Sequence, residues 1–500
     1  MRIESPPAPT DEAFALEPGR NCWRVARANR AAFIVDAADY YRHARKAMLA
    51  ARKHIFLMGW DVDTRIRLDT DANDGAPEFL GPLLSWLVHN RPELSIYILA
   101  WDGGAYKFLG RGSTLFRLAT WARHERMHFQ FDGAHPREAS HHQKILVVDD
   151  CLAFCGGIDM TGSRWDTRGH LDDHPGRRRP TTRRPYPPWH DTTMAVDGDA
   201  AKTLGDLARL RWKICTDREL PCCGTDDPPW PKALKPVFEN IDVGIARTRG
   251  RVEGWPEVRE IEALFVDMIE AAERFVYVEN QYFSSRVIAQ AVIKRLGETN
   301  GPEFCIVSPK KSQGWLDDEV MSPARAELMK AVDKADKYGR FRIYTPVTKG
   351  GEDIYVHSKV MIVDDRLFRV GSANFNNRSM GLDSECDLLV DGRGQPRTAL
   401  AISRIRADLM AEHLDCTPDE VEAAFERKGS LIATVDALRG DGRTLVPFVP
   451  EEPNRIEKMV AHSEVLDPET ADQPAFEPIA RQRLLWGLGR FAPRAGRGGP

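Results

Sequence analysis

The chain has 500 residues, more than the roughly 250–300 residues that one hydrophobic core usually organises, so we expect two domains or two closely packed lobes. Its 42% hydrophobic and 29% charged residues are typical of a globular protein, and a net charge of −4 argues against a general nucleic-acid-binding protein. The first residues lack the apolar core of a secretory signal, and no run of about 18 uncharged apolar residues follows, so we expect neither a signal peptide nor a membrane-spanning helix.

Buried strands are predicted at corresponding places in the two halves of the chain. The apolar runs are short, rich in β-branched residues and bounded by turn residues, and they lie at 55–58, 96–99, 145–148, 275–278, 305–307 and 360–363. A helical pattern precedes the first strand of each set and is clearest over 261–272. The order helix, strand, helix, strand, strand occurs twice, which predicts an α/β fold with helices on both faces of a central sheet.

The repeated order indicates an internal duplication and predicts the domain organisation. Proline density marks a linker, because Pro221 to Pro236 includes the run Pro228-Pro229-Trp230-Pro231. The chain again becomes rich in proline and glycine near its end, as mobile tails do. We therefore predict an N-terminal extension, a first lobe, a linker, a second lobe and a C-terminal tail, with the bounds 1–25, 26–220, 221–245, 246–440 and 441–500.

One motif occurs twice in the sequence, at 142–149 and at 357–364. Each copy reads H-x-K-x-x-x-x-D and is followed by a pair of small residues, Gly156-Gly157 or Gly371-Ser372. Because side chains alternate along a strand, His142 and Lys144 share a face, as do His357 and Lys359. The Asp of each copy has the opposite parity, so a supporting structural role is expected for Asp149 and Asp364.

An imidazole beside an ammonium group, supplied twice, suits attack on a phosphate diester. A histidine can act as a nucleophile or transfer protons, and a lysine stabilises charge on the phosphate oxygens. One histidine would form a phosphohistidine while the other gives a proton to the leaving alcohol. Two structural histidines beside surface lysines are the simpler explanation of a single copy, but duplication makes that explanation improbable.

These motifs resemble those of the phospholipase D superfamily, which is defined by two H-x-K-x-x-x-x-D copies. The resemblance covers roughly residues 30 to 440 and extends to Trp189-His190-Asp191, Glu279-Asn280-Gln281-Tyr282-Phe283 and Gly371-Ser372-Ala373-Asn374-Phe375-Asn376. It is closer to two-motif phospholipases than to short one-motif nucleases. It implies two similar α-β-α lobes in one chain, related by a pseudo-twofold axis, with both motifs at their interface.

The resemblance also implies roles for individual residues. His142 corresponds to the usual nucleophile and His357 to the acid and base, although the symmetry of the motifs leaves this order open. Carboxylates downstream of each motif hold the other ring nitrogen of the histidines in this family, and the matching positions are Asp191 and Glu385. Lys144, Lys359 and Asn374 are expected to bind the phosphate.

The first half holds Asp159 at the position that corresponds to Asn374. A carboxylate there would repel a diester unless it were protonated or turned away, so we assign no phosphate-binding role to Asp159.

Two further features lie between the first motif and Asp191. An insertion carries five arginines among prolines, and it is either a loop that attracts lipid head groups or a solvated loop; these are Arg177, Arg178, Arg179, Arg183 and Arg184. Several potential zinc ligands also occur in this stretch, namely His141, His142, His170, His174, His190, Cys151 and Cys155. No second Cys pair or H-E-x-x-H pattern accompanies them, so we predict no metal, and the mechanism needs no cofactor.

The function predicted from the sequence is a phospholipase D-type phosphodiesterase that releases phosphatidate and a free head-group alcohol, with probable transfer of the phosphatidyl group to an alcohol as well as to water. The alternatives are a cardiolipin synthase-like phosphatidyltransferase, a nuclease, which the acidic net charge disfavours, and a non-catalytic membrane-binding module. We expect a cytoplasmic protein peripheral to the membrane, or one exported without a signal. The sequence leaves the head group, the acyl chains and the oligomeric state open.

Overall fold

The computed structural model describes residues 14–104, 113–222, 230–311 and 315–449. The extension predicted over 1–25, the linker over 221–245 and the tail over 441–500 therefore lie partly outside the described residues, and the domain bounds stay predictions.

The first half of the chain alternates strands and helices as the sequence predicts. Its elements are β1 (Arg24–Val35), α1 (Ala37–Ala50), β2 (His54–Gly59), α2 (Leu80–Asn90), β3 (Ser95–Trp101), the 3-10 helix Asp102–Gly104, α4 (Ser113–Trp121), β4 (Met127–Asp132), β5 (Ile145–Val148), β6 (Leu152–Gly156), β7 (Trp189–His190), β8 (Thr192–Asp197) and α5 (Gly198–Thr216).

The second half repeats this order with a helical addition at its end. Its elements are β9 (Phe238–Arg249), β10 (Val258–Arg259), α6 (Glu260–Glu270), β11 (Phe275–Glu279), α7 (Arg286–Leu296), β12 (Glu303–Val307), α8 (Trp315–Ala335), β13 (Phe341–Val347), β14 (Tyr355–Val356), β15 (Val360–Val363), β16 (Leu367–Gly371), α9 (Asn377–Gly381), β17 (Glu385–Asp391), α10 (Pro396–Leu414), α11 (Pro418–Lys428), α12 (Leu431–Leu438) and β18 (Thr444–Pro447).

All six predicted strands are present, but each half has a helix–strand pair that the sequence prediction missed. α4 and β4 precede the first motif, and α8 and β13 precede the second. β4 is the outermost strand of its half and is only partly buried, so polar residues interrupt its apolar pattern. A half-exposed edge strand lacks the dense apolar run that marks a buried one.

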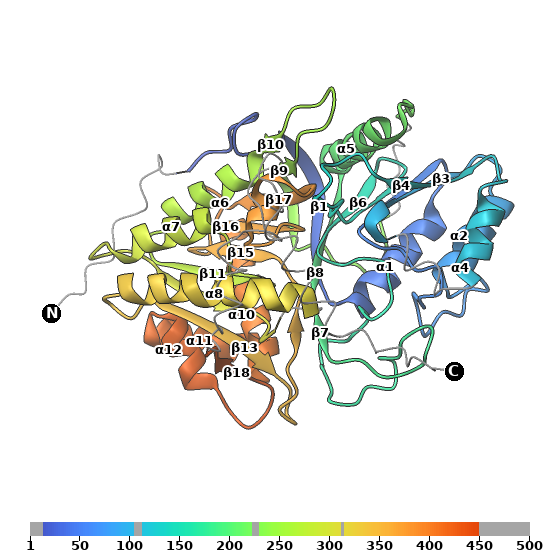
Figure 1. Cartoon of the computed structure of the whole chain (residues 1–500). Coiled ribbons are helices and arrows are strands. Elements are labelled where there is room, and N and C mark those ends of the chain that lie inside the picture. Colours follow the sequence, from blue (N-terminus) through green and yellow to red (C-terminus); the bar gives the residue numbers. More distant parts are fainter. Residues whose placement is uncertain (1–13, 105–112, 223–229, 312–314, 450–500) are drawn as a thin grey trace, which may run out of the picture.

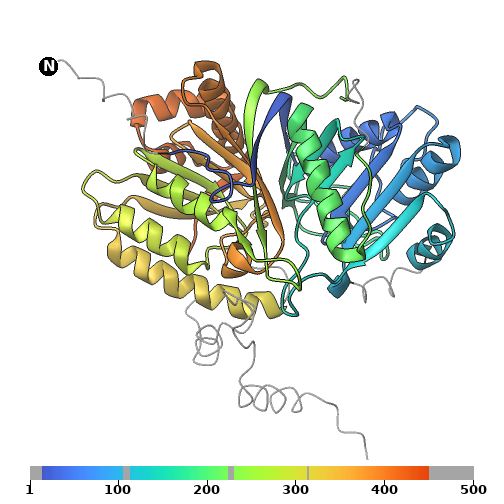
Figure 2. The same ribbon diagram turned by 90° about the horizontal axis from the view of Figure 1, so that it is seen from above.

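One mixed sheet, of sixteen strands among the described residues, joins the two halves. β1 and β9 pair antiparallel at its middle. Outward from β1 the order is β8, β6, β5, β2, β3, β4, and outward from β9 it is β17, β16, β15, β11, β12, β13. Each of these strands thus has a counterpart at the same place in the other half, and the halves lie side by side in Figures 1 and 2; β18, at the edge beside β13, and β10, which pairs with β9, are additional strands of the second half. The α/β fold class is confirmed, while the exact pseudo-twofold relation stays a prediction.

Apolar residues on both faces of the sheet build the core. Alternate residues of β2, β5 and β11 point to opposite faces, as the pleat requires. On one face a continuous core runs through both halves and includes α5, α10, α11 and α12. On the other face, α1 and α2 cover the first half and α6, α7 and α8 the second. Among the described residues, no helix is both long and apolar enough to span a bilayer.

The Asp of each motif begins the turn of a hairpin, β5–β6 or β15–β16. Asp149 and Asp150 have φ of 54° and 53°, and Asp364 and Asp365 both have 55°, a left-handed conformation that Asp adopts more readily than most residues. The Asp149 carboxylate accepts hydrogen bonds from the backbone N–H groups of Arg52, Lys53 and His54, at 2.7, 2.7 and 2.8 Å. Asp364 makes the same three contacts with residues 273–275, at the start of β11. Each carboxylate therefore fastens a motif strand to its neighbour.

We predict that Asp149→Ala lowers the free energy of unfolding by about 2–4 kcal/mol, because three N–H groups lose a charged acceptor. Asp149 is buried whereas Asp364 is partly exposed, so water can replace the lost acceptor better in Asp364→Ala, which should cost less. Denaturant unfolding of both variants measures this difference. An equal loss of unfolding free energy in the two variants would contradict the explanation that water replaces the acceptor at Asp364.

Candidate active site

The two motifs meet at one cavity of about 350 Å³. Both histidines line it, and the first motif and the second motif reach it from opposite halves of the sheet. The other lining residues are Trp60, Trp101, Arg137, Glu138, Ala139, Ser140, Asp159, Arg164, Gln281, Tyr282, Asn374, Asn376, Arg378 and Asp383.

Backbone contacts between the halves fix the first histidine. The residues before the motif bridge to the segment that leads into β17, and the His142 N–H donates to the Ser384 carbonyl at 3.0 Å. The Nδ1 atom of His142 then lies 2.9 and 3.0 Å from the two carboxylate oxygens of Glu385. A histidine of the first half is thus held by a carboxylate of the second.

The second histidine is held in the reciprocal way. β14 pairs in parallel with β7, so that the His357 N–H donates to the His190 carbonyl at 2.8 Å. Its Nδ1 atom lies 2.7 Å from Asp191 Oδ2. Nδ1 is engaged in both histidines, which leaves Nε2 of each for a reacting group.

The two carboxylates are fully buried and have different partners. Glu385 accepts hydrogen bonds from the hydroxyls of Ser372 at 2.6 Å and Ser379 at 2.7 Å, whereas Asp191 accepts one from the Thr192 N–H at 2.8 Å. Gly157, at the position of Ser372, leaves room for the shorter acid, because a Cβ there would come within 2.1 Å of Asp191 Oδ1. The small-residue pair after each motif therefore makes space for a carboxylate.

Burial shifts the pKa of both partners in each pair. It raises the pKa of Asp191 and of Glu385 to about 7. Burial, followed by repulsion from the nearby lysines, lowers the pKa of His142 and His357 well below 6.5. Both shifts disfavour the charged forms. Each carboxylate–imidazole pair therefore gains or loses one proton near neutral pH.

The two lysines have different neighbours. Lys144 Nζ donates to the His142 carbonyl at 2.8 Å and lies 3.5 Å from Asp159 Oδ2. Lys359 donates to the His357 carbonyl and to Gln281 Oε1, the latter at 3.3 Å. Burial lowers the pKa of Lys359 to about 7. The first lysine thus faces an anion and the second a neutral amide.

Asp159 is not turned away from the site, contrary to one of the possibilities left open by the sequence. It is buried, lines the cavity beside Lys144, and accepts a hydrogen bond from the Trp60 N–H at 2.8 Å. Its counterpart Asn374 lines the same cavity, and Asn374 Oδ1 is buried without a hydrogen-bond partner among the described residues. The charge of the site is therefore lower on the first-motif side.

Several cavity residues were not predicted from the sequence. Trp60 and Trp101 stack with ring centroids 5.4 Å apart, and Arg164 lies 4.1 Å above the ring of Trp189. Trp189 packs in turn on His357, at 5.1 Å between ring centroids. Trp60, Trp101 and Arg164 belong to no motif, and only their position at the carboxyl ends of strands or in the long loop before β7 could have indicated them, whereas Trp189 lies in a segment that already resembles the family.

The arginine-rich insertion is more structural than expected. Arg177 is buried, pairs with Asp166 at 3.2 Å and donates to the carbonyls of Leu171 and Asp172. A lipid-binding role for this arginine is therefore wrong, because its guanidinium group is enclosed in its own loop. Arg183 and Arg184 are exposed.

Histidines considered as zinc ligands separate into different environments. Cys151 and Cys155 lie in the β5–β6 hairpin, where their thiols face backbone carbonyls. His170 and His190 instead lie together with Asp36 and Glu412, far from each other in sequence.

Comparisons with known proteins show what this chain is similar to. Residues 265–405 match the family described as "Cardiolipin synthase, PLD-like domain". The chain is 25% identical over 433 residues to phospholipase D A of Dictyostelium discoideum, covering 69% of this chain and 31% of that protein. It is 23% identical over 506 residues to phospholipase D1 of Saccharomyces cerevisiae, covering 79% and 29%. The chain thus spans about a third of the length of these relatives.

Among solved structures, the phosphatidylserine synthase of Haemophilus influenzae superposes with a TM-score of 0.54 at 14% identity. The match covers 83% of this chain and 97% of that one, and it shows the same fold.

We predict that the crossed contacts are visible by NMR of histidine-labelled protein. Asp191→Asn should change the Nδ1 resonance of His357 and leave that of His142 unchanged, and Glu385→Gln should do the reverse, because each carboxylate contacts the histidine of the other half. A change confined to the histidine of the same half would contradict the structure.

Proposed function

Because the chain belongs to the phospholipase D superfamily, we propose that it is a phosphodiesterase that converts glycerophospholipids to phosphatidate and a free head-group alcohol. The observation that carries this proposal is the pair of imidazoles in one cavity, each anchored at Nδ1 by a buried carboxylate from the other half. Two imidazoles that differ by one proton are what double displacement at phosphorus requires.

In the first step His142 Nε2 attacks phosphorus and forms a P–N bond. The bond from phosphorus to the head-group oxygen breaks, and this oxygen takes a proton from His357 Nε2. In the second step water gives a proton to His357 and its oxygen attacks phosphorus, which breaks the P–N bond and releases phosphatidate. A primary alcohol can replace water in this step, so transfer of the phosphatidyl group is expected as well.

The two motif lysines, which lie behind the residues lining the cavity, and Asn374, which lines it, would stabilise charge on phosphorus. Lys144 lies beside Asp159, whereas Lys359 contacts a neutral amide and has a pKa that burial lowers to about 7, so a bound phosphate would favour the charged form of Lys359. Asn374 lines the cavity close to the same groups and offers an amide to the phosphate. The roles of Lys144, Lys359 and Asn374 as phosphate ligands rest on this arrangement.

Greater access supports His142 as the nucleophile. Its side chain is 14% exposed, against 8% for His357. His357 is also covered by Trp189, which suits a group that only exchanges protons. The substrate would be met at a membrane surface, with the chain on the cytoplasmic side or exported, and the aromatic pair Trp60 and Trp101 at the cavity would contact its apolar part.

A cardiolipin synthase-like phosphatidyltransferase is the second candidate. The match of residues 265–405 to a family of that description favours it, and it would use the same residues with phosphatidylglycerol as both donor and acceptor.

We predict that the full chain, incubated with vesicles of several phospholipids and a primary alcohol, produces phosphatidate and a phosphatidyl-alcohol. His142→Asn and His357→Asn should each lower turnover by about a thousandfold or more, because one step loses its nucleophile or its proton donor. His128→Gln, on the edge strand β4 outside the cavity, is the matched control. Mass spectrometry of the lipids measures the outcome.

Dominant formation of cardiolipin from phosphatidylglycerol would favour the second candidate. Cleavage of DNA with no lipid product would overturn both.

We also predict a narrow bell-shaped dependence of kcat/KM on pH, with a maximum near pH 7. As pH rises through about 7, the Asp191–His357 pair loses the proton that the leaving group needs. As pH falls through about 7, the Glu385–His142 pair gains a proton and the nucleophile is blocked. Glu385→Gln should therefore move the acidic limb and Asp191→Asn the alkaline limb. The opposite pattern would reverse the roles of the two histidines.

A further inference from the structure

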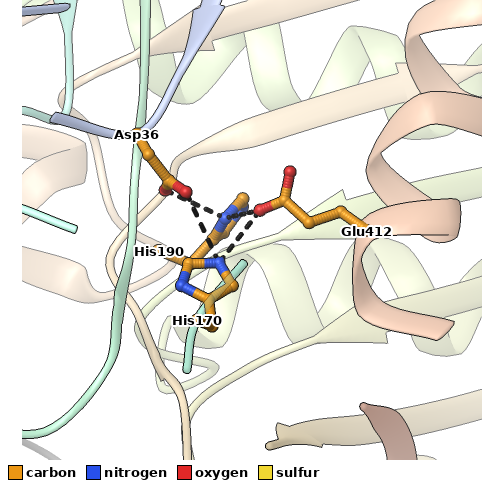
Figure 3. A group of neighbouring side chains, drawn as sticks. All are labelled: Asp36, His170, His190 and Glu412. Carbon is orange, nitrogen blue, oxygen red and sulfur yellow. Dashed lines mark hydrogen bonds and ion pairs between the residues drawn. The ribbon is translucent and has the colours of Figure 1, made fainter. Parts of the chain in front are cut away.

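A second cluster of histidines and carboxylates lies next to the segment that carries Asp191 and is drawn in Figure 3. It combines Asp36, between β1 and α1, His170, in the loop before β7, His190, in β7, and Glu412, in α10. All four side chains are at most 1% exposed. The first three residues belong to the first half of the chain and Glu412 to the second.

The protein holds both histidines by one ring nitrogen. His170 Nδ1 lies 3.0 Å from Asp166 Oδ2, and His190 Nε2 lies 2.9 Å from Glu279 Oε2. These outer carboxylates are held in turn, Asp166 by Arg177 and Glu279 by His413. Imidazoles that bind metals are oriented by such contacts, which leave the opposite nitrogen free to coordinate.

The two inner carboxylates are oriented in a comparable way. Arg168 donates to Glu412 Oε2, and the Asp191 N–H donates to Asp36 Oδ1 at 3.2 Å. Asp36 Oδ2 is buried without a hydrogen-bond partner among the described residues, although Asp36 occupies the N-cap of α1, where an Asp side chain commonly caps the helix. Its carboxylate turns to the cluster instead (Figure 3).

Four atoms therefore converge: His170 Nε2, His190 Nδ1, Glu412 Oε1 and Asp36 Oδ2. Glu412 Oε1 lies 3.0 Å from His170 Nε2 and 2.9 Å from His190 Nδ1, and Asp36 Oδ2 lies 3.5 Å from His170 Nε2. Bonds of about 2.0–2.1 Å to a tetrahedral zinc ion separate neighbouring ligand atoms by about 3.3 Å. Small adjustments of these side chains would give that geometry.

We propose that Asp36, His170, His190 and Glu412 bind one divalent transition-metal ion, and that zinc fits them best. Two imidazoles and two carboxylates suit zinc, whereas calcium and magnesium prefer oxygen ligands alone. All four positions are taken by protein, as in structural sites, so the ion would not contact substrate. The competing explanation is that no metal binds and that His170 and His190 each carry an extra proton, so that two positively charged imidazoles pair with the carboxylates.

The ion would fasten the two halves beside the catalytic cavity. Glu412 comes from the second half, whereas Asp36, His170 and His190 come from the first half, which also carries Asp191. His190 directly precedes Asp191 in sequence and its carbonyl accepts the His357 N–H, while Asp36 accepts the N–H of Asp191. The metal would thus position the carboxylate that holds His357, without a part in the chemistry.

Metal analysis of the full chain, purified without an affinity metal, tests this proposal. We expect about one zinc ion per chain. Removal by a strong chelator should lower the melting temperature, and Zn²⁺ alone should restore it. Asp36→Asn and His170→Gln should lower the zinc content at least about tenfold, and Glu279→Gln should weaken zinc affinity by about 10–100-fold. His141→Gln, which breaks a buried pair with Asp132 elsewhere, is the matched control and should keep the metal.

A metal-free wild-type chain whose melting temperature responds to neither chelator nor Zn²⁺ would overturn the proposal and show that protons fill the cluster. Equal zinc loss in His141→Gln would also overturn it. If the variants fail to fold, the wild-type measurements decide alone. None of these readouts depends on lipid turnover, so failure of the proposed function would leave the test intact.

Discussion

The crossed pairing of histidines with carboxylates is the contact on which the arrangement of the site depends. His142 lies on Glu385 and His357 on Asp191, so neither half holds its own histidine. These crossed pairs form only if the two halves keep a fixed position relative to each other. The antiparallel pairing of β1 with β9 supplies it over a long register, and the short β7–β14 pair repeats it next to the site. A shift of one residue between β1 and β9 would separate the pairs.

Burial gives these pairs their chemical character. In water a carboxylate would stay ionised at neutral pH, and its attraction for a nearby imidazolium would be screened. Here the carboxylates are enclosed, their pKa values rise to about 7, and those of the imidazoles fall. The proton of each pair is then gained or lost at little cost. The burial of these carboxylates within the fold is therefore what would let them take part in proton transfer near neutral pH.

The sequence predicted the motif strands but not the contacts between halves. Dense apolar runs such as 145–148 and 360–363 identify buried strands, and duplication identifies the motif. Whether Asp191 faces His142 or His357 depends on how two lobes dock, which no local pattern encodes. For the same reason the sequence did not predict the cluster of Asp36, His170, His190 and Glu412, because these residues have no regular spacing in the sequence. Arg177 was interpreted as a surface charge for the same reason, because the sequence does not show its contact with the buried Asp166.

The two halves carry the same motif, but the residues around the two lysines of the motif differ. A phosphoryl group between two equivalent lysines would meet a symmetric field and could be attacked from either side. Asp159 beside Lys144 and Gln281 beside Lys359 remove that symmetry, because the first lysine has an anion at 3.5 Å whereas burial lowers the pKa of the second to about 7. A phosphate beside Lys144 would be repelled by the carboxylate of Asp159, whereas a phosphate beside Lys359 would favour the charged form of that lysine. In the proposed mechanism the neutral imidazole of His142 would approach phosphorus from the first-motif side, and His357 would give its proton to the leaving oxygen on the other side, so the two steps would use the two different surroundings.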